Sequence, residues 1–168
     1  MPLMRDHAFV PDTYHQLTDD EAVPAEGNII VPLARLDEAE ARLKTGTENV
    51  GLHVPNTVKP DTLKPYFNSV ALISIAFPAF SDGRGFSIAR RLRRLGFTGI
   101  LRASGPLIAD QYAYAMACGF DEIALPDPLA KRQPIAQWQK AAGAISLAYQ
   151  RGYHRPATIL DRRRAAFA

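Results

Sequence analysis

The sequence predicts an α/β protein with a mostly parallel sheet of about five strands and helices on both faces. Short apolar runs alternate with helical segments about five times, and this rhythm is typical of β-α-β units. Residues 70–77 (VALISIAF) are apolar except for Ser74, as expected of a central strand that is covered on both sides. Because about five units are too few to close an eight-stranded barrel, a partial (β/α) barrel is the alternative.

The first half of the chain contains two of the expected strands. Residues 28–33 form a short apolar run, and residues 37–44 follow as a helix with an acidic start and a basic end, which suits the helix dipole. Gly46 is expected to end this helix. Residues 50–54 (VGLHV) alternate as a second strand.

The second half continues the alternation after the strand at residues 70–77. A helix is expected at residues 87–95, because its apolar side chains recur on one face, and Gly96 is placed to end it. The remaining elements are expected at residues 99–103 (strand), 106–119 (helix, with Gly119 at its end), 122–125 (strand) and 134–149 (helix).

The chain divides into three parts by pattern. Residues 1–27 lack periodicity and carry turn residues and acid, so they are expected to form an irregular N-terminal arm. Residues 28–150 hold the α/β domain. Residues 151–168 contain three consecutive arginines and are expected to form a loose, basic C-terminal tail.

Composition excludes several classes of protein and site. A single cysteine, Cys118, cannot form an internal disulfide or hold an iron–sulfur cluster, and we expect it to be buried and inert. The four histidines are scattered without metal-ligand spacing, so no metal site is expected. The arginine-rich residues 90–94 lack interleaved aromatics, which argues against nucleic-acid binding. No membrane-length apolar run or signal peptide is visible, so a soluble, cytoplasmic protein is expected.

Polar residues follow the expected strands at the points where the strands end. The carboxyl ends of parallel strands meet at one edge of the sheet, where α/β proteins bind ligands. We therefore expect an anion-binding site at this edge. Its candidate residues are Asp82, Gly83, Arg84, Gly85, Ser87, Arg102, Ser104 and Asp110.

The segment SDGRGFS is the most informative part of this site. Gly83 and Gly85 permit close approach of the backbone, the following helix presents unpaired N–H groups, and Arg84 adds a planar cation. Such a loop suits a phosphate, sulfate or carboxylate. The dinucleotide fingerprint G-x-G-x-x-G is incomplete, because Ile88 stands in the place of the third glycine. The alternative is purely structural, with a helix cap and an ion pair made by Arg84.

Arg102 ends an otherwise apolar strand and needs a carboxylate partner if it is buried. Asp82, Asp110 and Asp127 are the candidates at the same edge. Whether this pair is a structural tie or part of a ligand site stays open. The sequence identifies no catalytic residue.

The runs FSDGRGFSIARRLRR, GILRASG, ADQ and CGFDEIALPD resemble the core of a bacterial family catalogued as domain of unknown function 934, over about residues 66–128. Members are often encoded beside the haemoprotein subunit of sulfite reductase and are described as oxidoreductases of sulfite reduction. The resemblance implies a role in assimilatory sulfur metabolism, with sulfite reductase or its electron donor as a partner. It implies neither a mechanism nor an oligomeric state.

Two functions follow as hypotheses. The first is an accessory or binding protein of the sulfite reductase system, with the anion-binding loop at the sheet edge. The second is a small flavin- or nucleotide-dependent oxidoreductase of sulfur metabolism, in which FMN or another phosphate-bearing ligand binds the same loop. Whether the protein is an enzyme is left undecided.

Overall fold

The computed structural model describes residues 1–44 and 50–143. Its strands are β1 (Leu3–Arg5), β2 (Ala8–Val10), β3 (His15–Gln16), β4 (Ile29–Pro32), β5 (Val50–Val54), β6 (Leu72–Ala76), β7 (Ile100–Ser104) and β8 (Glu122–Ala124). Its α-helices are α1 (Glu40–Lys44), α2 (Arg84–Arg94), α3 (Tyr112–Cys118), α4 (Asp127–Arg132) and α5 (Ile135–Gly143), and its 3-10 helices are η1 (Leu33–Ala39), η2 (Pro60–Tyr66) and η3 (Ala109–Gln111). The predicted basic tail, the end of the predicted last helix and Gly46 lie outside the described residues.

The strands form one eight-stranded sheet in the order β2-β1-β8-β7-β6-β5-β4-β3. From β3 to β8 every neighbouring pair is parallel, whereas β1 pairs antiparallel with both β8 and β2. The prediction of a mostly parallel α/β sheet is confirmed, but the described sheet has eight strands where about five were expected, because residues 1–27 add β1, β2 and β3. The run at residues 70–77 gives β6, which lies between β5 and β7 with its first four residues buried.

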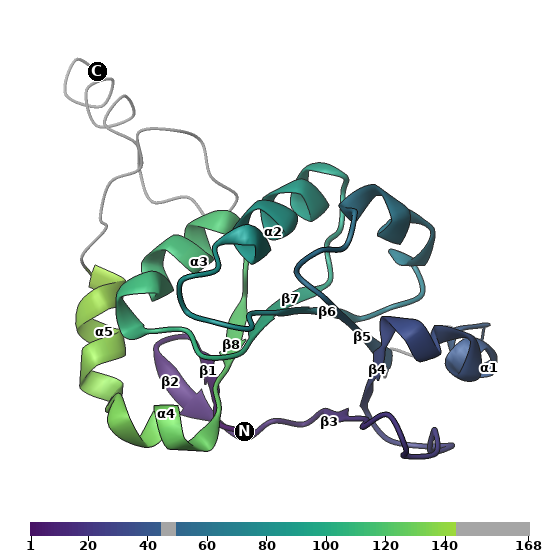
Figure 1. Ribbon diagram of the computed structural model, residues 1–168, viewed down its shortest axis with the longest axis horizontal. Helices are drawn as coiled ribbons and strands as arrows, with labels where there is room; N and C mark the ends of the chain where they lie inside the picture. The colour runs from purple at the N-terminus through teal and green to yellow at the C-terminus, as the bar shows by residue number, and fades with distance from the viewer. Residues whose placement is uncertain (45–49, 144–168) are drawn as a thin grey trace, which may run out of the picture.

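The sheet is curled into a half-barrel, the alternative that the sequence left open (Figure 1). Its two edge strands, β2 and β3, are consecutive in the chain and are joined by residues 11–14 alone. A flat sheet of eight strands is about 34 Å wide, whereas the chain from Val10 to His15 spans at most about 18 Å. The short connection therefore brings the two edges toward each other. We call residues 11–14 the strap.

The prediction that helices cover both faces is wrong. Parallel strands that neighbour one another in chain order, joined by right-handed crossovers, place all their helices on one side of the sheet. The main core accordingly joins alternate strand residues, such as Ile73, Leu101 and Ile123, to the buried side chains of α2 and α3. The other, concave face is polar along its middle and is crossed by the strap.

The expectation of an irregular arm at residues 1–27 is also wrong, because this segment supplies β1, β2 and β3. Strands of two or three residues are too short to show a period of two in the sequence. They are held by pairing, since β1 inserts between β2 and β8 and buries Leu3 and Met4 completely.

Glycines end two helices as the sequence predicts. Gly96 follows α2 with a φ of +99° and Gly119 follows α3 with a φ of +103°, both in the region that favours glycine. Within the described residues, no helix has the length and apolar character that are needed to cross a membrane.

Candidate functional site

Asp82 and Arg84 form an ion pair at the start of α2. The carboxylate of Asp82 accepts hydrogen bonds from Nε and Nη2 of Arg84, at 2.9 and 2.6 Å, and from Nδ2 of Asn56, at 2.7 Å. These hydrogen bonds hold the pKa of the Asp82 carboxyl well below its usual range, and those from Arg84 have the largest effect. The Arg84 side chain is 59% exposed. The loops after β5 and β6 are thereby tied together, while one edge of the guanidinium faces outward.

The two glycines beside Arg84 have different roles. A Cβ on Gly85 would lie 2.4 Å from the ring of Phe77, so this glycine is required for the close packing of α2 on the end of β6. A Cβ on Gly83 would meet nothing closer than Phe86 at 3.8 Å. Packing therefore explains Gly85. Ser87 lies on the exposed side of the first turn of α2.

Arg102 belongs to a row of polar side chains on the concave face. The strand register places Arg5, Glu122, Arg102, Ser74 and His53 opposite one another on β1, β8, β7, β6 and β5. Residues in register point to the same face of a sheet. We call these five residues the interior row. It crosses the half-barrel as one layer of side chains crosses the interior of a closed (β/α) barrel.

The row is closed by a network of charged side chains. Arg102, only 2% exposed, donates from Nε to Glu122 at 2.7 Å and from both terminal nitrogens to the strap residue Asp12, at 2.7 and 2.8 Å. Glu122 is fully buried and also accepts hydrogen bonds from Arg5. The ring of Tyr14 lies 5.7 Å from the Arg102 guanidinium. Two cations and two carboxylates balance one another.

The predicted partners of Arg102 are therefore wrong. Asp82 pairs with Arg84, and Asp127 pairs with the N-terminal amino group at 3.8 Å. The true partners, Asp12 and Glu122, lie 90 and 20 positions away in the chain. A signal for Glu122 existed, because it is the charged residue of a short apolar strand, in register with Arg102. No pattern in the sequence indicated Asp12.

Arg84 and Arg102 are not joined by a hydrogen bond or a shared carboxylate in the described part of the chain. Arg84 lies at the start of α2, outside the sheet, whereas Arg102 points into the half-barrel. Ser104, the last residue of β7, is half-buried, and its carbonyl oxygen accepts a hydrogen bond from the Phe77 amide at 2.7 Å. That these residues form one anion pocket stays a prediction.

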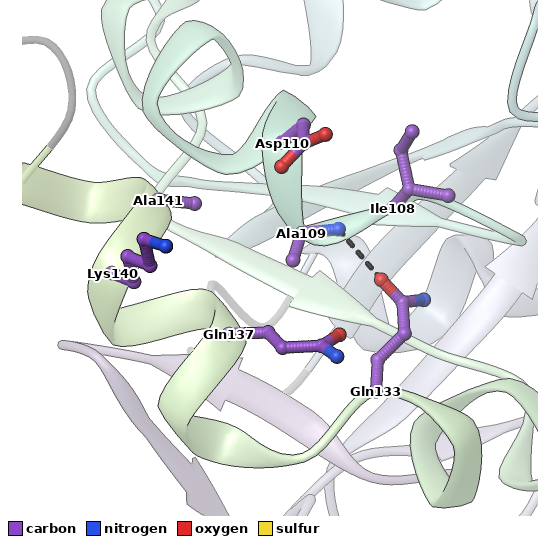
Figure 2. A pocket seen from close by; sticks show the side chains of 7 residues that line it. All are labelled: Ile108, Ala109, Asp110, Gln133, Gln137, Lys140 and Ala141. Carbon is purple, nitrogen blue, oxygen red and sulfur yellow. Dashed lines mark hydrogen bonds between the residues drawn. The ribbon is translucent and has the colours of Figure 1, made fainter.

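Asp110 lines a cavity of about 450 Å³ near the carboxyl end of β7. Figure 2 shows the cavity between η3 and α5, and we call it the η3–α5 cavity. Its lining residues are Ile108, Ala109, Asp110, Gln133, Gln137, Lys140 and Ala141. The buried side chain of Gln133 joins the two walls, since it accepts from the Ala109 amide at 2.7 Å and donates to the Leu107 carbonyl at 3.2 Å.

His53, on β5, is the last residue of the interior row, and its imidazole can titrate near neutral pH. Its Nδ1 lies 3.1 Å from Oγ of the fully buried Ser74. Burial lowers the pKa of the His53 imidazole below its ordinary value. Sequence reasoning did not single out this residue, because one histidine in an alternating strand carries no spacing signal.

The lowered pKa of His53 predicts how stability depends on pH. Below about pH 6.5 the unfolded chain binds a proton at this residue that the folded protein does not, so the free energy of unfolding should fall as the pH falls. The slope contributed by one histidine is at most about 1.4 kcal/mol per pH unit. Urea unfolding between about pH 7.5 and 5.5 should show this loss in the wild type and a smaller one in His53→Gln. An NMR titration midpoint for His53 at or above the ordinary value would contradict the prediction.

Cys118 and the potential metal-ligating side chains of the described ranges add no further candidate site. Cys118 is buried, and burial raises the pKa of its thiol, which agrees with an inert packing role. Residues 1–44 and 50–143 contain no group of three histidine, cysteine or acidic side chains that could hold a metal ion.

Comparison with known protein families identifies the family of this chain. The model of a bacterial protein family of unknown function, DUF934, matches residues 51–160. The chain belongs to the DUF934 family. The match begins in β5 and takes in the 82–87 segment, Arg102, Glu122 and the η3–α5 cavity, whereas Asp12, Arg5 and the strap precede it. Neither the curated proteins nor the solved structures contain a match to this chain.

Proposed function

We propose that this DUF934 protein is an accessory, binding protein of assimilatory sulfite reduction that holds a small oxyanion at the 82–87 segment. The family resemblance supports the metabolic setting, with sulfite reductase or its electron donor as the partner. The structural support is the orientation of Arg84. Its Nε and Nη2 face Asp82, whereas Nη1 has no hydrogen-bond partner among the described residues.

The free edge of Arg84 suits a tetrahedral or trigonal oxyanion. A guanidinium binds two oxygens of such an anion through its terminal nitrogens, and Asp82 holds it in place. Arg84 is the first residue of α2, an eleven-residue helix whose N-terminal dipole also favours a negative charge. The Asp82 carboxylate reduces the local positive charge, so binding depends on these directed contacts rather than on net charge.

Calorimetric titration with sulfite, sulfate, phosphate and FMN tests the proposal. We expect saturable binding of an oxyanion to the wild type and a loss of about three- to tenfold in affinity in Arg84→Ala. Arg94→Ala is the matched control, because Arg94 is an exposed arginine at the other end of the same helix. Equal affinities in the two variants, or no anion binding by the wild type, would contradict the proposal. Tight binding of FMN alone would favour the flavin-dependent oxidoreductase.

The metabolic role has a separate test. Deletion of the gene in its bacterial host should prevent growth on sulfate or sulfite as the only sulfur source and leave growth on sulfide intact. The wild-type gene should restore growth, and the Arg84→Ala gene should restore it less well than Arg94→Ala. Normal growth of the deletion strain on sulfite would contradict a role in sulfite reduction.

A further inference from the structure

The η3–α5 cavity carries an inference that goes beyond the proposed function. It lies next to the loop that follows β7, so it is at the edge of the sheet where parallel α/β folds bind ligands. Its volume of about 450 Å³ falls within the range of ~300–1,000 Å³ that is common for small-molecule sites. Arg84 is not among its lining residues, so the cavity is separate from the 82–87 segment.

The walls of the cavity are held in place by buried contacts. Gln133, at 9% exposure, uses its side-chain amide to join the chain before η3 to the residues between α4 and α5. The backbone carbonyl oxygen of Gln133 accepts a hydrogen bond from Nε1 of the fully buried Trp138 on α5 at 3.3 Å. The Trp138 ring packs edge-on against Tyr112 of α3, with their centroids 5.9 Å apart. The position of α5 relative to η3 is therefore set by the core.

Three exposed polar side chains line this cavity. Asp110 comes from η3, and Gln137 and Lys140 come from α5 (Figure 2). None of the three side chains forms a hydrogen bond or an ion pair with another residue in the described ranges. Asp110 and Lys140 have opposite charges and share one cavity, yet their charged atoms are farther apart than an ion pair allows. Other aspartates at the surface, such as Asp61 and Asp82, are paired with arginines.

A ligand that carries both charges could pair with both of these unpaired side chains. We propose that the η3–α5 cavity binds a free α-amino acid with an apolar side chain. Its ammonium group donates to the Asp110 carboxylate, and its carboxylate accepts from Lys140 and from the side-chain amide of Gln137. Its side chain lies on the apolar part of the lining, which is supplied by Ile108, Ala109 and Ala141.

Blocked ligands separate the two ends of the proposed site. Calorimetry with L-leucine, L-methionine and L-valine should show saturable binding to the wild type. N-acetyl-leucine lacks the ammonium charge and leucine amide lacks the carboxylate, and each should bind at least about fivefold more weakly than leucine. No binding of the free amino acids, or equal binding of the blocked forms, would overturn the proposal.

Charge-removing variants assign each end to a residue. Asp110→Asn should bind leucine and N-acetyl-leucine alike, and Lys140→Met should bind leucine and leucine amide alike. Both residues are exposed, so the variants are expected to fold. Lys131→Met, which removes an exposed lysine of α4 outside the cavity, is the control and should bind as the wild type does. Equal loss of leucine binding in this control would overturn the assignment. Because none of these variants alters Arg84, failure here leaves the oxyanion proposal intact.

Discussion

Arg102→Met is expected to cost about 3–5 kcal/mol of folding free energy, because it removes one partner from a buried ion network. Glu122 has no exposed surface and would keep only Arg5, whose side chain is 39% exposed. The strap would lose the two hydrogen bonds that Asp12 accepts from the terminal nitrogens of Arg102. At ~2–4 °C per kcal/mol for a chain of this size, the melting temperature should fall by about 6–20 °C.

Urea unfolding of matched variants tests this expectation. Arg91→Met is the control, because it removes an arginine from an exposed ion pair with Asp61 and should change stability little. The double variant Arg102→Met, Glu122→Gln should recover part of the loss, since it no longer buries an uncompensated carboxylate. If Arg102→Met is as stable as Arg91→Met, the interior row does not hold the half-barrel together.

Gly105→Ala is expected to cost about 3–5 kcal/mol of folding free energy. Backbone strain and the overlap of the new methyl group with neighbouring atoms both contribute. Gly105 has a φ of +142°, and a Cβ at this position would lie 2.0 Å from the carbonyl oxygen of Phe77. The residue sits where the ends of three strands meet, because its amide donates to the Ala124 carbonyl at 3.1 Å. The backbone would have to move away from β6 or β8 to admit a methyl group.

Gly96→Ala separates the two causes. Gly96 also has a positive φ, of +99°, but no atom lies within 4 Å of the place that its Cβ would take. This variant should therefore show the strain alone, about 1–2 kcal/mol. Denaturant unfolding of both proteins gives the cost of the overlap as their difference. Equal costs for the two substitutions would show that the end of β7 is not packed as described.

Local patterns in the sequence were sufficient for most of the strands and helices after residue 28. The strand predicted at residues 50–54 has the same bounds as β5, and the apolar run at residues 70–77 contains β6. Gly96 and Gly119 marked helix ends because a left-handed backbone conformation is a local requirement. In these segments, the periodicity of apolar residues reports burial directly. α4 was missed, since its six residues are too few to show a helical period.

The curvature of the sheet and the partners of Arg102 were decided by the tertiary structure. The sequence showed that a buried arginine needs a carboxylate, but several carboxylates were available and the choice depends on which face of the sheet the arginine occupies. On that face the strap carries Asp12 to Arg102, which lies 90 positions away in the chain. The curl, in turn, follows from pairing of residues 1–16 at both edges of the sheet. Long-range pairing of this kind leaves no local period in the sequence, because its stability comes from contacts that form only when distant segments meet.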